Sequence, residues 1–145
     1  MDMTLEGKTG ALFSLPVEFG KIHEFAEAIQ SSMSHYRKTA ATYAPPTFLT
    51  TSFFWERRVA GSDLLDALAL NPGSAVHASQ EYRFFGQPPQ AGCTLTAQTR
   101  IDKLQTKINK SGTPLHIAEL VTEYRDGERL VAESRMTVIE PEQTP

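Results

Sequence analysis

The second half of the chain constrains the fold most, because it consists of four extended segments separated by short turns. Apolar and polar residues alternate along these segments, as they do in a sheet with one buried face. In residues 93–109, for example, Leu95 and Ile101 fall on one face, and Thr96 and Arg100 fall on the other. This alternation predicts long strands with an apolar side that another layer must cover.

Two dipeptides predict that neighbouring strands run antiparallel. Asp126-Gly127 lies between two of the segments and is a strong signal for a tight hairpin. Ser111-Gly112 is placed to turn the preceding pair of strands. Residues 10–15 read as a short additional strand near the start of the chain. We therefore expect a sheet built from residues 10–15, 75–86, 93–109, 114–125 and 128–140.

A long amphipathic helix is expected between the first strand and the rest of the sheet, over residues 16–36. Its apolar residues recur at steps of three and four, which places them on one helical face: Ile22, Phe25, Ala26, Ile29, Met33 and Tyr36. Residues 47–58 are dense in aromatic side chains and fit either a helix or a strand. Ser62 is expected to cap a short helix that runs to Leu70.

The economical arrangement of these elements is a curved antiparallel sheet wrapped around one central helix, because the helix of residues 16–36 is the only long apolar cover available. This is an α+β fold of the hot-dog type. The length predicts a single domain over residues 1–145, with frayed ends at about 1–6 and 141–145.

Charge and cysteine content favour a cytoplasmic protein. A net charge of −3 with 21% charged residues provides no basic field for nucleic acid or for an anionic membrane. No apolar run reaches the roughly 18 residues that span a bilayer. Cys93 is the single cysteine and has no internal disulfide partner, which fits a reducing compartment. We therefore expect neither a nucleic-acid partner nor a membrane partner.

Four segments in a fixed order resemble the MaoC-like dehydratase family, and the match is closest to its N-terminal, first hot-dog type. The segments are FAEAI (25–29), APPTF (44–48), HASQEYRFFGQPPQAGCTLTAQTRI (77–101) and VTEYRDGERLVAESRMTVI (121–139). The resemblance implies reversible hydration of 2-enoyl thioesters carried on coenzyme A or acyl carrier protein. It implies no cofactor besides this thioester substrate. It also implies that two hot dogs work as a pair.

The catalytic signature of the family is degenerate in this chain. Active members carry a Gly-Asp-x-Asn-Pro-x-His run after the helix, and its Asp and His move the protons. Superposing that run on the chain places Ser31 at the aspartate and Tyr36 at the histidine, while His35 lies one position away. Serine lacks a neighbouring base, and tyrosine with a pKa near 10 is a poor one. No catalytic residue is therefore assigned in this chain.

The resemblance also implies that the loop after the helix, residues 37–58, forms part of the acyl pocket. The candidate contacts are Tyr43, Pro45, Pro46, Phe48 and Phe53, and His77 is a further candidate for lining the groove. The alternative is that the loop residues only pack the loop onto the domain and that His77 is a hydrogen-bonded sheet residue. Four dispersed histidines and one cysteine show no metal-ligand spacing, so no metal site is expected.

Three functions remain open. The first is the non-catalytic subunit of a heteromeric (R)-specific enoyl-thioester hydratase or 3-hydroxyacyl-thioester dehydratase, whose catalytic MaoC-like partner supplies Asp and His. The second is a free-standing hot-dog dehydratase or thioesterase that uses another group, such as Glu24 or His77. The third is a homodimeric acyl-thioester binding module without chemistry. We favour the first, and we expect the isolated chain to form a homodimer through exposed sheet edges.

Overall fold

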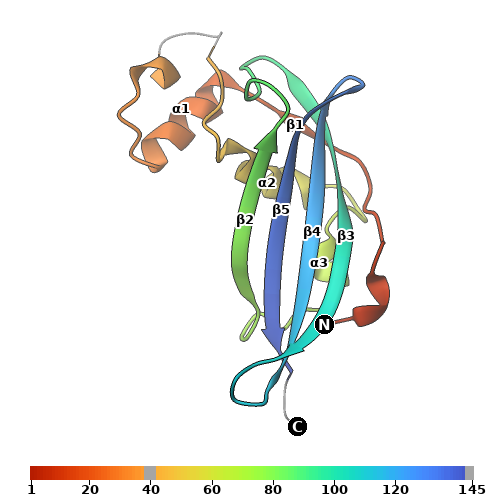
Figure 1. Cartoon of the computed structure of the whole chain (residues 1–145). Coiled ribbons are helices and arrows are strands. Elements are labelled where there is room, and N and C mark those ends of the chain that lie inside the picture. Colours follow the sequence, from red (N-terminus) through yellow and green to blue (C-terminus); the bar gives the residue numbers. More distant parts are fainter. Residues whose placement is uncertain (38–41, 143–145) are drawn as a thin grey trace.

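The computed structural model describes residues 1–37 and 42–142 and contains one five-stranded antiparallel sheet (Figure 1). The strand order is β1-β3-β4-β5-β2. The strands are β1 (Phe13–Pro16), β2 (Val76–Phe84), β3 (Thr94–Ile108), β4 (Pro114–Asp126) and β5 (Arg129–Pro141). The α-helices are α1 (Phe19–Ala28), α2 (Ser52–Glu56) and α3 (Leu64–Ala67). Three 3-10 helices are η1 (Met3–Leu5), η2 (Ser34–Arg37) and η3 (Phe48–Thr51).

Tight turns produce the two hairpins that the sequence predicts. Gly112 between β3 and β4 has a φ of +86°, and Gly127 between β4 and β5 has a φ of +59°. Glycine adopts this left-handed region without the steric cost that a Cβ atom causes. In the second hairpin, Asp126 is the register partner of Arg129. The five expected strands are confirmed, with their ends shifted by a few residues at most.

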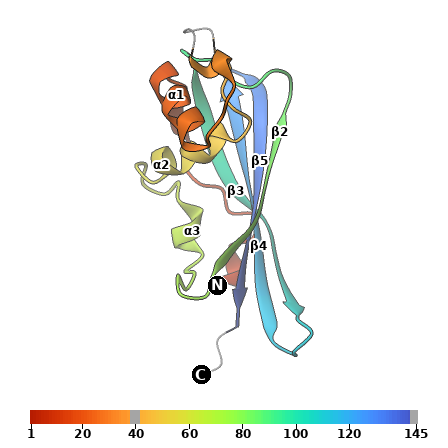
Figure 2. The same ribbon diagram turned by 90° about the vertical axis from the view of Figure 1, so that its left-hand side faces the viewer.

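All three α-helices lie on one face of the sheet, with α1 at one end of the layer, α2 in the middle and α3 at the other end (Figure 2). Alternate residues of β3 point toward this face and are buried: Leu95, Ala97, Thr99 and Ile101. The α+β class and the antiparallel sheet with a helical cover are thus confirmed.

The segment that covers the middle of the sheet is η3 followed by α2, and the expectation that residues 16–36 form the central helix is wrong. Phe48 and Leu49 are each only 1% exposed. The hydroxyl of Ser52 lies 2.9 Å from the hydroxyl of Tyr124 on β4, and α2 also packs against β1. Residues 47–58, which fitted helix or strand equally in the sequence, therefore supply the central helix.

Helix α1 is shorter than its apolar periodicity predicts. It ends at Ala28, because Gln30 adopts a φ of +55° that no α-helix continues. Ile29 and Met33, expected on the buried face, are 48% and 56% exposed. The buried part of α1 packs against the central segment, where the ring of Phe25 meets the ring of Phe48 edge-on at 5.7 Å.

Two smaller expectations differ from the structure. Asp63 rather than Ser62 caps α3, because the Asp63 carboxylate accepts hydrogen bonds from two amides of the first turn. Ser62 instead donates to backbone carbonyl oxygens of Glu56 and Val59. Within the expected frayed start, Met3–Leu5 form η1, which Asp2 caps, and Leu5 packs against a group of buried residues that includes Leu64 and Ile101. Of the expected frayed tail, residues 143–145 lie outside the described part of the chain.

Candidate functional site

A cavity of about 570 Å³ lies between the inner face of the sheet and the layer formed by α2 and α3. Strands β2, β3, β4 and β5 all contribute side chains to it. We call it the central cavity. Its volume falls in the range of small-molecule sites in proteins, and its walls divide into a polar part under α2 and an apolar part under α3.

The polar part of the sheet is a row of hydroxyl groups that crosses four strands at one level. Tyr82 on β2 is the register partner of Ser134 on β5, Ser134 of Thr122 on β4, and Thr122 of Thr99 on β3. All four residues line the central cavity. We call this set the hydroxyl row. Such an alignment follows from pairing register, because side chains of directly opposed residues share one face of a sheet.

Hydrogen bonds hold the hydroxyl row under α2. The hydroxyls of Thr99 and Thr122 are 2.9 Å apart. The Tyr124 hydroxyl, one step further along β4, lies 2.9 Å from the Ser52 hydroxyl and 3.4 Å from that of Ser134. Burial raises the pKa of Tyr124 to about 12, so this phenol stays protonated near neutral pH.

Glu56 is the carboxyl group of the central cavity. It lies at the end of α2, and Thr99 is the neighbouring hydroxyl that favours its ionised form. Burial is the main cause that raises the pKa of Glu56, and the neighbouring charge of Asp63 raises it further, while the Thr99 hydroxyl opposes them. Its Oε1 atom is buried and has no hydrogen-bond partner among the described residues. A buried acceptor of this kind is costly unless something binds it.

No pattern in the sequence singles out Glu56. The residue stands directly before Arg57 and Arg58, and such a charged run is typical of a solvated surface. In the structure, however, Arg57 pairs with Asp63 at 3.2 Å and Arg58 stacks on the ring of Trp55 at 4.7 Å. The sequence signal that could have found it is its position three residues after Phe53, since residues three apart share a side of a helix and both line the cavity.

The apolar part of the central cavity lies under α3. The row of residues next to the hydroxyl row includes Gln80, Met136 and Leu120, which are register partners across β2, β5 and β4. Leu64 and Leu65 of α3 face them across the cavity. The central cavity therefore combines a hydrocarbon wall with a polar band.

The site residues predicted from the sequence are not brought together in one pocket. Phe53, 39% exposed, and His77 both line the central cavity. Nε2 of His77 lies 3.1 Å from the carbonyl oxygen of Ser79. Phe48 and Pro45 are buried in the core, and Pro46 is exposed. Residues 38–41 of the predicted pocket loop lie outside the described part of the chain.

Tyr43 lines a second cavity of about 470 Å³, which also borders Cys93, Asp126 and Arg129. Burial is the main cause that raises the pKa of the Cys93 thiol, so the reactive thiolate is disfavoured. Cys93 lies directly before the first residue of β3.

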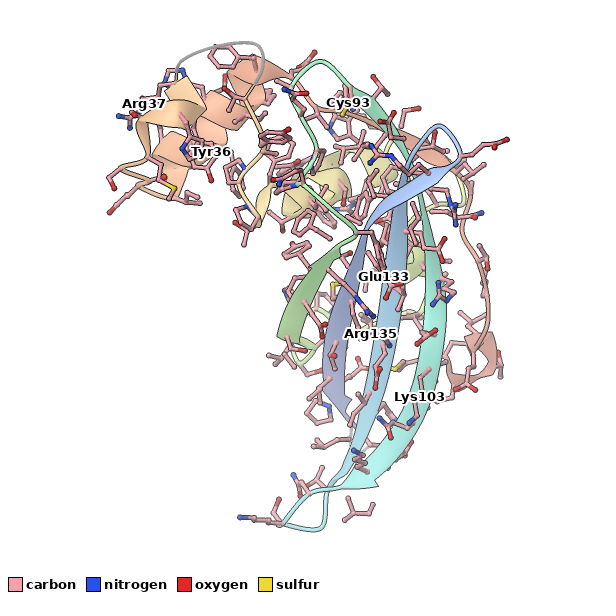
Figure 3. All side chains as sticks on the ribbon, turned by 45° about the horizontal axis from the view of Figure 1, so that its top comes forward. Tyr36, Arg37, Cys93, Lys103, Glu133 and Arg135 are labelled. Atoms are coloured by element: carbon pink, nitrogen blue, oxygen red, sulfur yellow. The ribbon has the colours of Figure 1, made fainter. Side chains whose placement is uncertain are left out.

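The two degenerate dyad positions, Ser31 and Tyr36, are not among the residues that line either cavity. Tyr36 is 7% exposed and lies with η2 beside α1, as does its neighbour Arg37 (Figure 3). Within the described ranges, the carboxylate–imidazole ion pair is His23 with Glu27 at 3.3 Å. That pair lies on the exposed side of α1 and does not line the central cavity. The described residues also contain no group of three or more potential ligands that could hold a metal ion.

The two edges of the sheet differ. On the β3 side, β1 pairs with Thr94–Ala97 and the first residues of the chain follow the strand further. The amides of Gly7 and Gly10 donate to carbonyl oxygens of Ile101 and Thr99, and the Glu6 carboxylate accepts from the amide of Leu104. On the opposite side, β2 pairs only with β5 among the described strands, and its residues from Val76 to Glu81 are all exposed. Strand β2 is thus the open edge of the sheet.

A curved antiparallel sheet with a central helix and a cavity between them defines a hot-dog domain. The chain belongs to the family described as FAS1-like, dehydratase domain region, whose sequence model matches residues 6–134. This confirms the MaoC-like assignment made from the sequence. A comparison with curated proteins gave no match.

Solved structures agree on the fold. The HadBC (3R-hydroxyacyl-ACP dehydratase) complex of Mycobacterium tuberculosis contains a chain of 20% identity with a TM-score of 0.66, covering 93% of this chain and 96% of that one. A chain of the ChsH1-ChsH2 complex of the same organism has 17% identity and a TM-score of 0.64, and the match covers 95% of this chain and 86% of that one. A MaoC-like dehydratase from Phytophthora capsici has 16% identity and a TM-score of 0.70, and the match covers 99% of this chain and 50% of that one. No helix among the described residues has the length and hydropathy needed to cross a membrane.

Proposed function

We propose that this chain is the non-catalytic subunit of a heteromeric (R)-specific enoyl-thioester hydratase or 3-hydroxyacyl-thioester dehydratase. The observation that supports it best is a dehydratase-type hot-dog fold whose central cavity contains no paired carboxylate and imidazole among the described residues. Hydration of an enoyl thioester needs a base for water and a proton donor for the α-carbon. Loss of one such positioned group typically lowers the rate by roughly 10²–10⁴-fold.

The open edge strand β2 supports a partner. An unpaired edge offers backbone donors and acceptors to a strand from another chain. The side chain of Val76 on this strand is apolar and 58% exposed, and it lines the central cavity. Two structures with similar folds are complexes of two differently named subunits. Another similar chain is about twice as long as the matched part, as expected if it joins two hot dogs covalently.

In this proposal the central cavity receives the acyl group of the substrate, and the catalytic partner supplies the Asp and His. Phe53 and His77 would form part of its wall. Direct acyl contacts by Tyr43, Pro45, Pro46 and Phe48 remain predictions. The substrate is an acyl thioester of coenzyme A or acyl carrier protein, without a further cofactor. The cytoplasmic location is likewise a proposal, supported by the single cysteine.

The test is to co-express this chain with short hydratase-like chains that carry the complete Gly-Asp-x-Asn-Pro-x-His signature. Hydration of an enoyl-CoA is then assayed for each purified chain and for the mixture. We expect the mixture to exceed the sum of the separate activities by at least tenfold. Turnover by this chain alone at the rate of the mixture would contradict the proposal.

One observation favours the second candidate, a free-standing hot-dog hydratase or thioesterase. Glu56 places a carboxyl with a raised pKa in the central cavity, where it could act as an acid or a base. Glu24, the helix carboxylate considered from the sequence, instead pairs with Lys21 on the exposed side of α1 at 2.8 Å. This candidate predicts turnover by the isolated chain that is abolished in Glu56→Gln. Saturable acyl-CoA binding without turnover or partner would point to the binding module.

A further inference from the structure

The polar band of the central cavity is unusual for a site that receives only a hydrocarbon chain. Polar groups in an apolar cavity reduce its affinity for saturated hydrocarbon, because the chain removes water from them without replacing its hydrogen bonds. Here Thr99, Thr122 and Ser134 are only 3%, 9% and 6% exposed, so these hydroxyls belong to the inner part of the cavity rather than to a wet rim.

The exposure of the lining residues gives the cavity a direction. The lining residues Val76, His77 and Gln80 on β2 are exposed, whereas Thr99 on β3 is buried. An occupant that enters at the β2 side therefore crosses β5 and β4 before it reaches Thr99 and Glu56. Three strand spacings separate β2 from β3, which is about 14 Å.

At the inner end, one polar atom has no internal partner. The hydroxyls of Thr99 and Thr122 bond to each other at 2.9 Å, and Tyr124 bonds to Ser52 at 2.9 Å. The Oε1 atom of Glu56 is buried without a hydrogen-bond partner among the described residues. Its environment is suited to a donor from a ligand, because the neighbouring cations Arg57 and Arg58 are engaged elsewhere.

We infer that the central cavity selects an acyl group with a second oxygenated position, a hydroxyl far along the chain from the 3-position, and that this distal hydroxyl donates a hydrogen bond to Glu56 Oε1 at the end of the hydroxyl row. The apolar wall formed by Leu64, Leu120 and Met136 holds the hydrocarbon part of the same acyl group. This inference rests on the proposed function for the acyl thioester and adds the substrate class. Glu56 acts here as a specificity determinant.

The test is isothermal titration calorimetry of the purified full chain with dodecanoyl-CoA and with monohydroxylated forms whose hydroxyl lies beyond the 3-position, with the 3-hydroxy form as the reference for the ordinary dehydratase substrate. We expect at least one isomer to bind about tenfold more tightly than the saturated compound, the gain of one buried hydrogen bond to a carboxyl group. The gain should depend on hydroxyl position, because only some positions reach Glu56.

Two variants and a matched control separate the role of Glu56 from effects on folding. Glu56→Leu removes the acceptor, so the ratio of the two affinities should fall to about one while saturated binding is kept or improved. Glu56→Gln keeps an acceptor oxygen and should retain part of the preference. Glu24→Leu changes a carboxylate on the exposed side of α1 and should leave the ratio unchanged. Circular dichroism and thermal melting verify that each variant is folded.

Equal binding of all isomers by the unmodified chain would overturn the inference and would mean that water fills the polar band; the acyl-binding role would stand. A preference that persists in Glu56→Leu would also overturn it. Absence of any thioester binding would remove the inference too, whereas the partner role is decided separately by the activity of the mixed subunits.

Discussion

At the scale of single residues, the carboxyl of Glu56 is held in an environment that disfavours its charge. No ion pair to it is found among the described residues, since Arg57 binds Asp63 and Arg58 stacks on Trp55. The Thr99 hydroxyl favours the ionised form, yet desolvation by burial outweighs it and raises the pKa. The folded protein therefore holds this proton to a higher pH than the unfolded chain does.

This shift predicts how stability depends on pH. Because the folded-state pKa of Glu56 is raised, its stabilising contribution is fully present below the unfolded pKa of about 4.3 and is lost as pH rises through the folded pKa. The free energy of unfolding of the unmodified chain, minus that of Glu56→Gln, should therefore decrease from pH 4 upward. Urea unfolding at a series of pH values measures both.

The pH-dependent contributions of the other carboxyl groups are the same in the unmodified chain and in Glu56→Gln, so they cancel when the two free energies of unfolding are subtracted. The variant is needed for this reason. Asp102, for instance, has its pKa lowered by the hydrogen bond from Arg135, so its contribution is lost as pH falls. Glu24→Gln serves as the control at an exposed site. A difference between the unmodified chain and Glu56→Gln that stays flat or grows with pH would mean that the carboxyl is not desolvated.

At the scale of elements, the segment from Phe48 to Glu56 connects α1 with the sheet. Its ring contact with Phe25 holds α1, and its Ser52 hydroxyl bonds to Tyr124 on β4. Thr50 lines the central cavity together with Tyr82 on the edge strand β2. A short helix of this kind is stable because tertiary packing holds it, not because of its own propensity.

We predict that Phe48→Ala lowers the free energy of unfolding by roughly 3–5 kcal/mol, the cost of emptying a fully buried aromatic site. Ile29→Ala should change it by about 0.5 kcal/mol or less, because Ile29 is 48% exposed beyond the end of α1. Urea denaturation followed by tryptophan fluorescence measures both. Similar losses for the two variants would indicate that residues 16–36 form one long buried helix instead.

The strands could be predicted from the sequence because each carries its own evidence. The alternation through Leu95 and Ile101 fixes which face is buried, and Gly112 and Gly127 stand where the backbone needs a positive φ. Such local signals need no knowledge of the rest of the fold. Only the exact ends of the strands differ from the expectation.

The central helix could not be assigned, because tertiary packing decides it. The apolar period from Ile22 to Met33 is a real helical signal, yet the positive φ of Gln30 breaks it, and the aromatic run after Pro46 had no clear period. Phe53 and His77 were predicted for the site and do line the cavity, but its polar part was not predicted, for a related reason. Thr99, Thr122 and Ser134 are distant in sequence, and only the pairing register aligns them beneath Glu56.

At the scale of the whole molecule, the sheet has two faces and two edges, and three of these four already make contacts within the chain. The helices cover the inner face, and the first residues of the chain cover the β3 edge. On the outer face, ion pairs link three strands: Arg135 bonds to Asp102 at 2.7 Å and to Glu119 at 3.0 Å. Glu133, Arg135 and Lys103 mark this face in Figure 3. The β2 edge remains for association.

The final prediction tests this edge directly. In the isolated chain, Val76→Asp should raise the dissociation constant of the homodimer by at least tenfold, because it removes an apolar contact worth roughly 1.5–3 kcal/mol and places a charge at the interface. Leu12→Asp is the matched control: Leu12 is 59% exposed, close to the 58% of Val76, but precedes β1 at the opposite edge. Sedimentation velocity over a concentration series measures both. If Leu12→Asp weakened the dimer and Val76→Asp did not, association would occur through the β1 side, and the central cavity would face solvent rather than a catalytic partner.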